Sequence, residues 1–172
     1  MDLKLKDKVA LVTGTGSQIG YGKGIALTLA QEGCDIISAD IDLEGARQTA
    51  AGVEALGRQS LAVKVDVRDR AEVYDMVRKG LEKFGRIDIL INNAGVSGKW
   101  KPFVEMTKED WDYDIGINFY GQMNVAHAVL PHMISCKCGR IINTSGGQGI
   151  PGISMYGASK GCLLYTSDAA DE

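Results

Sequence analysis

This sequence has few cysteines, no long apolar run and nearly equal numbers of acidic and basic residues. Four cysteines in 172 residues, with nothing that points to secretion, indicate reduced thiols rather than a disulfide framework. No apolar stretch approaches the roughly 18 residues of a membrane span. Charges continue through Lys8 before the short apolar run Val9–Val12, which is not the pattern of a secretory signal. Nineteen bases against 22 acids give no electrostatic footprint for nucleic acid or an anionic membrane.

What is present is the composition of an ordinary globular domain. Apolar residues make up 45% of the chain and charged residues 24%, and there is no internal repeat, low-complexity tract or interdomain linker. A chain of this length can bury a sizeable core, and one domain is the expectation. We therefore expect a cytoplasmic protein whose partner is a small molecule, not a nucleic acid or a membrane.

Short β-rich runs alternate with longer helical patterns, which is typical of βαβ units on a parallel sheet. We predict an α/β fold, a Rossmann-like doubly wound parallel sheet. We also expect this sheet to lack its last strand or strands and helices, because five strands are predicted and such a sheet normally has about six. The expected strands are Val9–Thr13, Asp35–Asp40, Ser60–Asp66, Ile87–Asn92 and Arg140–Thr144, and the expected helices are Tyr21–Glu32, Leu43–Leu56, Arg70–Phe84, Lys108–Met133 and one that starts near Ser154.

The last residues, Cys162–Glu172, differ from the rest of the chain. They hold three acids and no base, and the string resembles one reading frame of a transposon-type sequencing adapter. We therefore expect an incomplete dinucleotide-binding domain over residues 1–161 and a non-native tail over residues 162–172. The alternative is a genuine acidic helix end, since Leu163 and Leu164 could continue a helix.

A turn of small residues follows the first predicted strand. It runs over Thr13–Gly20 and leads into a helix, so its backbone can approach a diphosphate whose charge lies at the helix N-terminus. Asp40 closes the second strand, twenty residues after Gly20. A carboxylate there accepts hydrogen bonds from ribose hydroxyls and repels a 2′-phosphate, which favours NAD over NADP. The alternative is that Asp40 or Asp42 only caps the next helix, as Asp42 is expected to do.

Candidate cofactor-binding residues gather at the carboxyl ends of several strands. Because these ends meet at one edge of a parallel sheet, the crevice outside them is the expected ligand site. Asp66 and Val67 could flank an adenine, although each segment taken alone is also a plausible turn. The predicted cofactor-binding residues are Gly14, Ser17, Gln18, Ile19, Gly20, Asp40, Asp66, Val67, Asn93, Ala94, Gly95, Tyr156 and Lys160.

Tyr156 and Lys160 stand four residues apart, on one face of the last predicted helix. A nearby ammonium stabilises a phenolate and lowers the pKa of a phenol, so that the phenol can give or take a proton near neutral pH. On its own such a pair is more often a packed ring and a solvated charge. Behind a dinucleotide-binding half-domain, the catalytic interpretation is favoured.

Together these motifs resemble the short-chain dehydrogenase/reductase family over about Leu5–Gly161. The turn Thr13–Gly20 is similar to the family's cofactor loop, Asn92–Gly95 to its NNAG segment, and Tyr156 with Lys160 to its YxxxK pair. The resemblance implies hydride transfer between NAD(H) and a secondary alcohol or ketone.

The resemblance also implies a role for each catalytic candidate. Tyr156 would be the general acid/base, and Lys160 would stabilise its phenolate and hold the nicotinamide ribose. Asn118 would support a proton relay from a helix that is locally distorted. Ser145 would polarise the substrate carbonyl.

Two positions depart from the family's pattern. Gln18 stands where the family has the second glycine of its cofactor loop, so its side chain must point away from a diphosphate or contact the ribose. Gly146 stands where the family has the carbonyl-polarising serine, and Ser145 lies one residue early. Ser145 could substitute if the strand end shifts, and such a donor is usually a large catalytic contribution. Otherwise Ser145 is a turn residue, and Thr144 or Gln148 are weaker candidates.

Two histidines and two cysteines fall within twelve residues, but they do not predict a metal site: His127, His132, Cys136 and Cys138. His127 and His132 are five residues apart and share a helix face poorly, and there is no Cys-x-x-Cys pair. We therefore predict no metal. Cys34 is expected to be a buried small apolar residue.

Several functions stay open. The first is an NAD-dependent dehydrogenase or reductase, either similar to a 3-oxoacyl reductase or similar to a sugar or polyol dehydrogenase. The second is a nucleotide-binding module without catalysis, which the glycine at position 146 prompts, and the third is an inactive fragment of such an enzyme. The resemblance also implies a homo-oligomer for the complete protein, formed through the long helices that flank the site.

Overall fold

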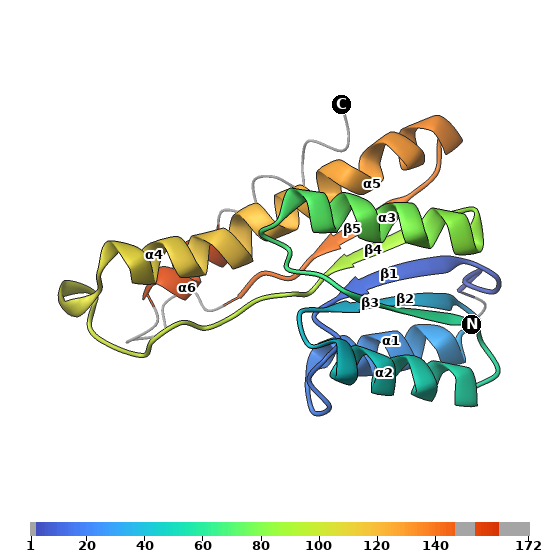
Figure 1. Ribbon diagram of the computed structural model, residues 1–172, viewed down its shortest axis with the longest axis horizontal. Helices are drawn as coiled ribbons and strands as arrows, with labels where there is room; N and C mark the ends of the chain where they lie inside the picture. Colours follow the sequence, from blue (N-terminus) through green and yellow to red (C-terminus); the bar gives the residue numbers. More distant parts are fainter. Residues whose placement is uncertain (1–2, 147–153, 162–172) are drawn as a thin grey trace.

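The computed structural model of the chain describes residues 3–146 and 154–161. The strands within these residues are β1 (Val9–Thr13), β2 (Asp35–Asp40), β3 (Ser60–Lys64), β4 (Ile89–Asn92) and β5 (Arg140–Asn143). They form one parallel sheet in the order β3-β2-β1-β4-β5 (Figure 1). This order confirms the predicted fold class, an α/β, Rossmann-like doubly wound parallel sheet.

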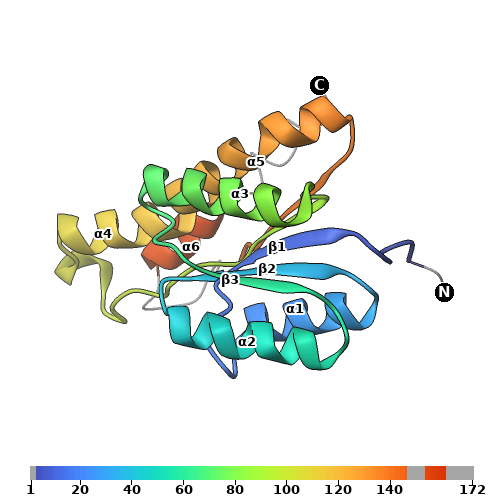
Figure 2. The same cartoon turned by 45° about the vertical axis from the view of Figure 1, so that its right-hand side comes forward.

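Helices cover both faces of the sheet. The helices of the described residues are α1 (Tyr21–Gln31), α2 (Leu43–Ala55), α3 (Arg70–Phe84), the 3₁₀ turn η1 (Phe103–Glu105), α4 (Lys108–Ile115), the π-helix η2 (Gly116–Gly121), α5 (Gln122–Cys136) and α6 (Ser154–Gly161). α1 and α2 pack on one face, and α3 and α5 pack on the other (Figures 1 and 2). Side chains alternate along β1 accordingly, because Val9 and Leu11 face α3 and α5 whereas Ala10 and Val12 face α1 and α2.

The strand order places the change of winding direction between β1 and β4. β1 pairs with β2 on one side and with β4 on the other, so that Val12 lies opposite both Ser38 and Ile91. The carboxyl ends of β1 and β4 are therefore neighbours, and the segments that follow them lead to opposite faces of the sheet. This is where ligands bind in open α/β sheets.

Most helix ends follow from the local sequence. Each glycine predicted to follow a helix has a positive φ angle, as expected for a left-handed C-terminal residue: Gly33, Gly57 and Gly85. Asp42 caps α2, as predicted, by accepting the first free backbone N–H groups of that helix. Thr107 and Asp110 form a reciprocal capping box at the start of α4.

Some element boundaries differ from the prediction. β3 and β5 end earlier and β4 begins later than predicted, and α1 and α2 each end one residue early. Val65 and Ile87 lie just outside β3 and β4, yet both are buried. The apolar pattern therefore continues past the hydrogen-bonded ladder and overstates the length of these strands.

The single helix predicted over Lys108–Met133 is divided into α4, η2 and α5, and it continues to Cys136. In η2 the backbone hydrogen bonds span five residues instead of four, which widens the helix locally. This is the distortion that the family resemblance implies around Asn118. In residues 3–146 and 154–161, no helix combines the length and the apolar character that crossing a membrane requires.

Candidate functional site

The turn after β1 is built around glycines that lie very close to neighbouring backbone. Gly14 has a φ angle of 73°, and its N–H donates to the Ala39 carbonyl at 2.8 Å. Gly20 is the N-cap of α1. A Cβ atom at Gly22, in the first turn of α1, would lie only 2.0 Å from the Gly14 carbonyl oxygen. The close packing of helix on strand therefore depends on Gly22.

Gly22 is a close-packing glycine that the prediction for this turn did not include. The sequence interpretation ended the turn at Gly20 and noted Gln18 where the family has its second glycine. The structure places α1 after Gly20, so the residue that must be small to approach the strand is two positions further on. The Gly-Tyr-Gly string at positions 20–22 carried the signal, because it puts a second glycine in the first helical turn.

Gln18 is an exposed residue, but its side chain is hydrogen-bonded to other parts of the protein. Its Nε2 donates to the carbonyl oxygens of Gly16 and Gly45 at 2.8 and 3.0 Å, and its Oε1 accepts a hydrogen bond from Lys23 Nζ at 2.8 Å. This ties the turn to the first turn of α2. A Cβ atom at Gly45 would lie 2.2 Å from the Gly16 carbonyl oxygen, so Gly45 is a second glycine that sequence reasoning missed.

Asp40 lies at the carboxyl end of β2, directly beside this turn. Its Oδ2 accepts the Gly16 N–H at 2.7 Å, and its Oδ1 accepts the Asp42 N–H at 2.9 Å. A Cβ atom at Gly16 would lie 2.7 Å from Asp40 Cγ. The carboxylate is half-buried and fixed in place, with lone pairs left for further donors. By contrast, Ser17 and Ile19 lie at the exposed tip of the turn, and Ile19 is fully exposed.

The residues after β4 tie the ends of two strands together. Asn93 Nδ2 donates to the carbonyl oxygens of Thr13 and Gly14 at 3.0 and 3.1 Å. Thr13 Oγ1 in turn accepts the N–H groups of Asn93 and Ala94 at 3.1 and 3.0 Å. The Asn93 side chain therefore holds the floor of the crevice between β1 and β4.

Asp66 and Val67 follow β3, as predicted, but the Asp66 carboxylate is already engaged. Arg68 donates to both of its oxygens, at 2.6 Å from the terminal nitrogen, and this hydrogen bonding lowers the pKa of Asp66. Val67 is buried and packs where a Cβ atom at Gly121 would lie, 2.5 Å from its Cγ2.

Three predicted residues from distant parts of the chain meet beside the end of β4. A Cβ atom at Gly95 would lie 2.8 Å from Lys160 Nζ and 2.9 Å from Asn118 Oδ1. Gly95 belongs to the segment after β4, Asn118 to η2 and Lys160 to α6. The fold therefore brings the NNAG, asparagine and YxxxK motifs to one place, and the first of them must lack a side chain there.

Asn118 is completely buried and fully engaged. Its Oδ1 accepts the Val96 N–H at 2.9 Å, and its Nδ2 donates to the Val96 carbonyl at 2.8 Å and to Ser159 Oγ at 3.0 Å. The side chain thus joins three parts of the site: η2, the segment after β4, and α6.

Lys160 is the most unusual side chain of the site. It is 1% exposed, and its Nζ has no hydrogen-bond partner among the residues that the structure describes. Burial lowers the pKa of Lys160 to about 8. A buried ammonium without partners is costly, so its position indicates a ligand with hydrogen-bond acceptors. Tyr156 lies one helical turn earlier on α6 and is half-buried.

Ser145 and Gly146 follow β5, next to α6. Ser145 Oγ donates to the Lys160 carbonyl oxygen at 3.1 Å, so its one proton is directed at the backbone of α6. Gly146 has a φ angle of 156°, which few other residues adopt, and no described residue lies within 4 Å of a Cβ atom placed there. Gln148, a weaker candidate, lies outside the described residues.

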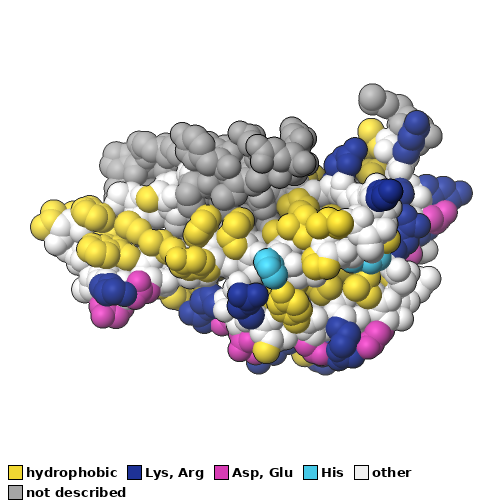
Figure 3. Space-filling model, turned by 90° about the horizontal axis from the view of Figure 1, so that it is seen from above, with side chains coloured by type: hydrophobic (Ala, Val, Ile, Leu, Met, Phe, Trp, Pro, Cys, Tyr) yellow, Lys and Arg dark blue, Asp and Glu magenta, His cyan; other side chains and the backbone are white. Residues whose placement is uncertain are grey.

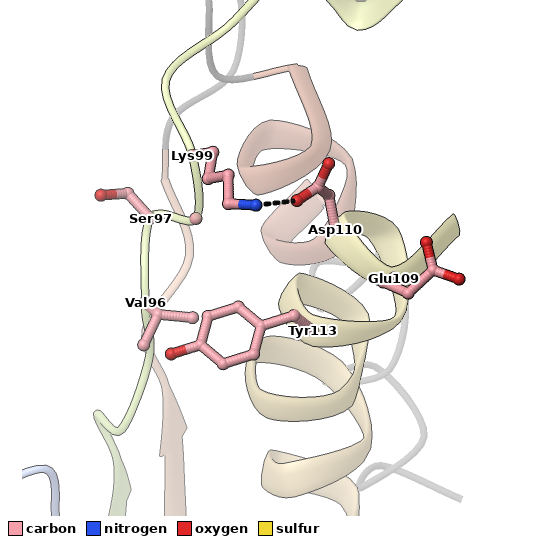
Figure 4. A pocket seen from close by; sticks show the side chains of 7 residues that line it. Val96, Ser97, Lys99, Glu109, Asp110 and Tyr113 are labelled. Carbon is pink, nitrogen blue, oxygen red and sulfur yellow. Dashed lines mark ion pairs between the residues drawn. The ribbon is translucent and has the colours of Figure 1, made fainter. Parts of the chain in front are cut away.

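A cavity of about 610 Å³ adjoins this group of residues (Figure 4). It lies between the segment after β4 and the side of α4, with the Tyr113 ring facing Val96 and with Lys99 paired to Asp110 at 3.1 Å. Lys101 also contacts Asp110, and these two ammonium groups lower the pKa of Asp110. The lining residues are Val96, Ser97, Gly98, Lys99, Glu109, Asp110 and Tyr113.

Both histidines, and the cysteines among the described residues, lie apart from this site. His127 pairs with the Tyr74 hydroxyl, and His132 Nε2 accepts the Ile87 N–H. Cys34 is buried, as predicted, and burial raises its pKa to about 11. Over the part of the chain that the structure describes, no three His, Cys, Asp or Glu residues are grouped as metal ligands would be.

The doubly wound sheet, the glycine turn at the start of α1 and the polar strand ends define a Rossmann-like α/β protein. Its sequence matches the family model described as short chain dehydrogenase over residues 8–172. The chain belongs to this family.

Relatives extend the comparison. The 3-oxoacyl-[acyl-carrier-protein] reductase FabG of Thermotoga maritima is 39% identical over 165 residues, which are 94% of this chain and 66% of that protein. The oxidoreductase UcpA of Salmonella typhimurium is 42% identical over 165 residues, 94% of this chain and 61% of that protein. The crystal structure of NAD⁺-bound xylitol dehydrogenase superposes with a TM-score of 0.92 at 35% identity, covering 97% of this chain and 65% of that one. The chain thus spans 61 to 66% of the length of these relatives.

Proposed function

We propose that the complete protein is an NAD-dependent oxidoreductase that transfers hydride between NAD(H) and a secondary alcohol or ketone. The observation that carries this proposal is the buried, unpartnered ammonium of Lys160, placed beside Gly95 and Asn118 at the carboxyl end of β4. The structural relative with bound NAD⁺ and the reductase among the sequence relatives support the same reaction class.

The residues present fit a dinucleotide. The first turn of α1 begins at a glycine and packs directly on Gly14, so its free backbone N–H groups face the crevice where a diphosphate would lie. Asp40, held beside the turn, would accept the adenosine ribose hydroxyls and disfavour a 2′-phosphate, so we propose NAD rather than NADP. Bound NAD would supply the hydride acceptor or donor. The turn after β1 and the floor of the proposed dinucleotide site would be formed by Ser17, Gln18, Ile19, Gly20, Asn93 and Ala94. Asp66 and Val67 would lie at the adenine end.

Proton transfer would fall to residues of α6 and η2. Tyr156 would be the general acid/base, and the ammonium of Lys160 would favour its phenolate and bind the nicotinamide ribose hydroxyls. Asn118 would hold the relay, since its side chain already joins η2 to α6 through Ser159. Ser145 would polarise the substrate carbonyl after its proton turns away from the Lys160 carbonyl oxygen.

The catalytic unit we propose is longer than this chain. Its relatives extend beyond the matched region. We keep residues 162–172 as a proposed non-native tail on the basis of the sequence string alone, although the family model matches through residue 172. We also propose a homo-oligomer, because exposed apolar side chains gather along the helical face that carries α4 and α5 (Figure 3). A cytoplasmic location fits the free thiols of Cys34, Cys136 and Cys138.

The substrate class is the widest part of the proposal. The names of the relatives include a 3-oxoacyl reductase and a xylitol dehydrogenase, so acyl ketones and polyols are the first compounds to test.

The source DNA is read beyond the codon for Gly161, and the complete protein is purified. NADH and NADPH binding are measured by fluorescence, and turnover is measured over both compound classes. Binding of NADH more tightly than NADPH, with turnover that Tyr156→Phe abolishes, is expected. Absence of dinucleotide binding would overturn the proposal.

A nucleotide-binding module without catalysis is the second candidate. It is favoured by Gly146 at the expected serine position and by the hydrogen bond that directs Ser145 to the backbone of α6. The variant Gly146→Ser in the complete protein separates the two. A large gain from near-zero turnover indicates a degenerate site, whereas substantial activity that is lost in Ser145→Ala shows that Ser145 already acts.

A further inference from the structure

The segment after β4 is held along one side of α4 and η2 by acceptor side chains at regular spacing. Asn118 binds both backbone groups of Val96, and the Asp114 carboxylate lies against the backbone of Gly98, where a Cβ atom would be 2.3 Å from Oδ1. Asp110 binds the ammonium groups of Lys99 and Lys101 at 3.1 and 2.5 Å. The three acceptors are each four residues apart, so they lie on the same side of the helix.

The spacing of the two elements matches. Four helical residues rise about 6 Å, and two residues of extended chain span about 6.6 Å. The segment runs opposite to the helix, so Val96 meets Asn118, Gly98 meets Asp114, and the lysines that follow meet Asp110. Each contact therefore fixes the next, and together they set the position of the segment against α4.

Asp114 makes the middle one of these three contacts, and it is the residue least expected at a buried position. It is 3% exposed, its Oδ1 has no hydrogen-bond partner within the described residues, and burial raises its pKa. Both nearby lysines of the segment pair with Asp110 instead. An apolar side chain would pack at this place at lower cost than an unpaired carboxylate. Helix packing alone therefore does not account for Asp114, but its close contact with the backbone of Gly98 does.

Gly98 is matched to this partner. A Cβ atom there would lie 2.3 Å from Asp114 Oδ1, so any other residue would force either the Asp114 carboxylate or the segment to move and would break their present contact. The same segment forms one wall of the 610 Å³ cavity and begins at Gly95, which lies against Lys160 (Figure 4). A shift of Gly98 would therefore move the wall that adjoins the reacting groups.

We propose that Asp114 is a positioning residue, whose carboxylate fixes Gly98 and thereby the substrate-side wall Val96–Lys99. The catalytic consequence rests on the proposed function, but the contact itself does not. Asp114 would affect how substrate is held and leave dinucleotide binding to the turn after β1 and to Asp40.

The test compares two replacements of Asp114 in the complete protein. Asp114→Asn keeps an acceptor of the same shape, whereas Asp114→Leu removes it. Hydrogen exchange of a peptide over residues 96–101, followed by mass spectrometry, reports the contact without any substrate. We expect wild-type protection in Asp114→Asn and at least tenfold faster exchange in Asp114→Leu. Asp112→Leu is the matched control, because Asp112 is an exposed acid on the same helix that pairs with Lys108.

Gly98→Ala attacks the same contact from the other side and decides the matter if Asp114→Leu does not fold. With a substrate identified, we expect the KM for substrate to rise at least fivefold in Asp114→Leu and Gly98→Ala, with most of that rise reversed in Asp114→Asn. The Kd for NADH should stay within twofold. Unchanged exchange in Asp114→Leu, or equal loss of protection in Asp114→Asn, would overturn the proposal. If the expected differences in hydrogen exchange are found but the complete wild-type protein shows no turnover, the result counts against the proposed function and not against the role of Asp114.

Discussion

At least one residue of the proposed site lowers the stability of the ligand-free protein. Lys160 shows this most clearly, because its ammonium is buried next to Asn118 and Gly95 with no partner among the described residues. Its lowered pKa means that the folded state binds the Lys160 proton less tightly than the unfolded chain does. Below a pH of about 8 the folded protein therefore bears the full cost of the charge.

In the complete protein, Lys160→Met should accordingly raise the free energy of unfolding at pH 7, by on the order of 1–3 kcal/mol, while abolishing NAD-dependent turnover. The gain should shrink as the pH rises from about 8, the folded pKa, and vanish above about 10.4, the unfolded one, where the wild-type lysine is neutral in both states. Denaturant titrations at pH 7 and pH 10.5 measure both points. A variant that is less stable than wild type at pH 7 would show that Lys160 has a stabilising partner.

Whole elements show what sequence reasoning could and could not reach. The strands of a parallel sheet and the covering helices follow from periodicity, because apolar residues form continuous runs or recur over many positions, whereas the strand order was not predicted. The convergence of Gly95, Asn118 and Lys160 could be predicted only through the family resemblance. Gly22, Gly45 and the Asp114 contact were missed. Each depends on an approach between backbones or side chains that are far apart in the sequence, and no local pattern encodes that distance.

The junction between β1 and α1 gives a sharp test at this scale. In the complete protein, Gly22→Ala should lower the free energy of unfolding by about 1–3 kcal/mol and abolish NADH binding, because the new methyl group would meet the Gly14 carbonyl and force α1 off the strand. Gly24, on the same helix, has nothing within 4 Å of a Cβ atom and is exposed. Gly24→Ala should therefore stabilise the protein by about 0.5–1 kcal/mol. Thermal unfolding and NADH fluorescence distinguish them, and equal effects would contradict the assignment of Gly22.

At the scale of the whole molecule, the sheet is unevenly protected. The β3 edge ends in a short strand next to α2 and α3, whereas β5 pairs only with β4 within the described residues. Ile142 on β5 is 53% exposed, and Ile134 on the neighbouring helix α5 is 70% exposed. A parallel edge strand with one free side and apolar side chains beside it is a template for association with other chains.

The 172-residue chain, purified alone, should therefore associate as its concentration rises and show no cooperative thermal transition. The complete protein should unfold cooperatively, because further strands and helices would pair β5 and cover α5. Ile142→Lys in the 172-residue chain is expected to reduce association severalfold by placing a charge on the open edge. The matched change Ile41→Lys, at another exposed isoleucine away from β5, should leave it unaltered. Light scattering across a concentration series measures both, and a monomeric chain with a sharp transition would show that the edge is already protected.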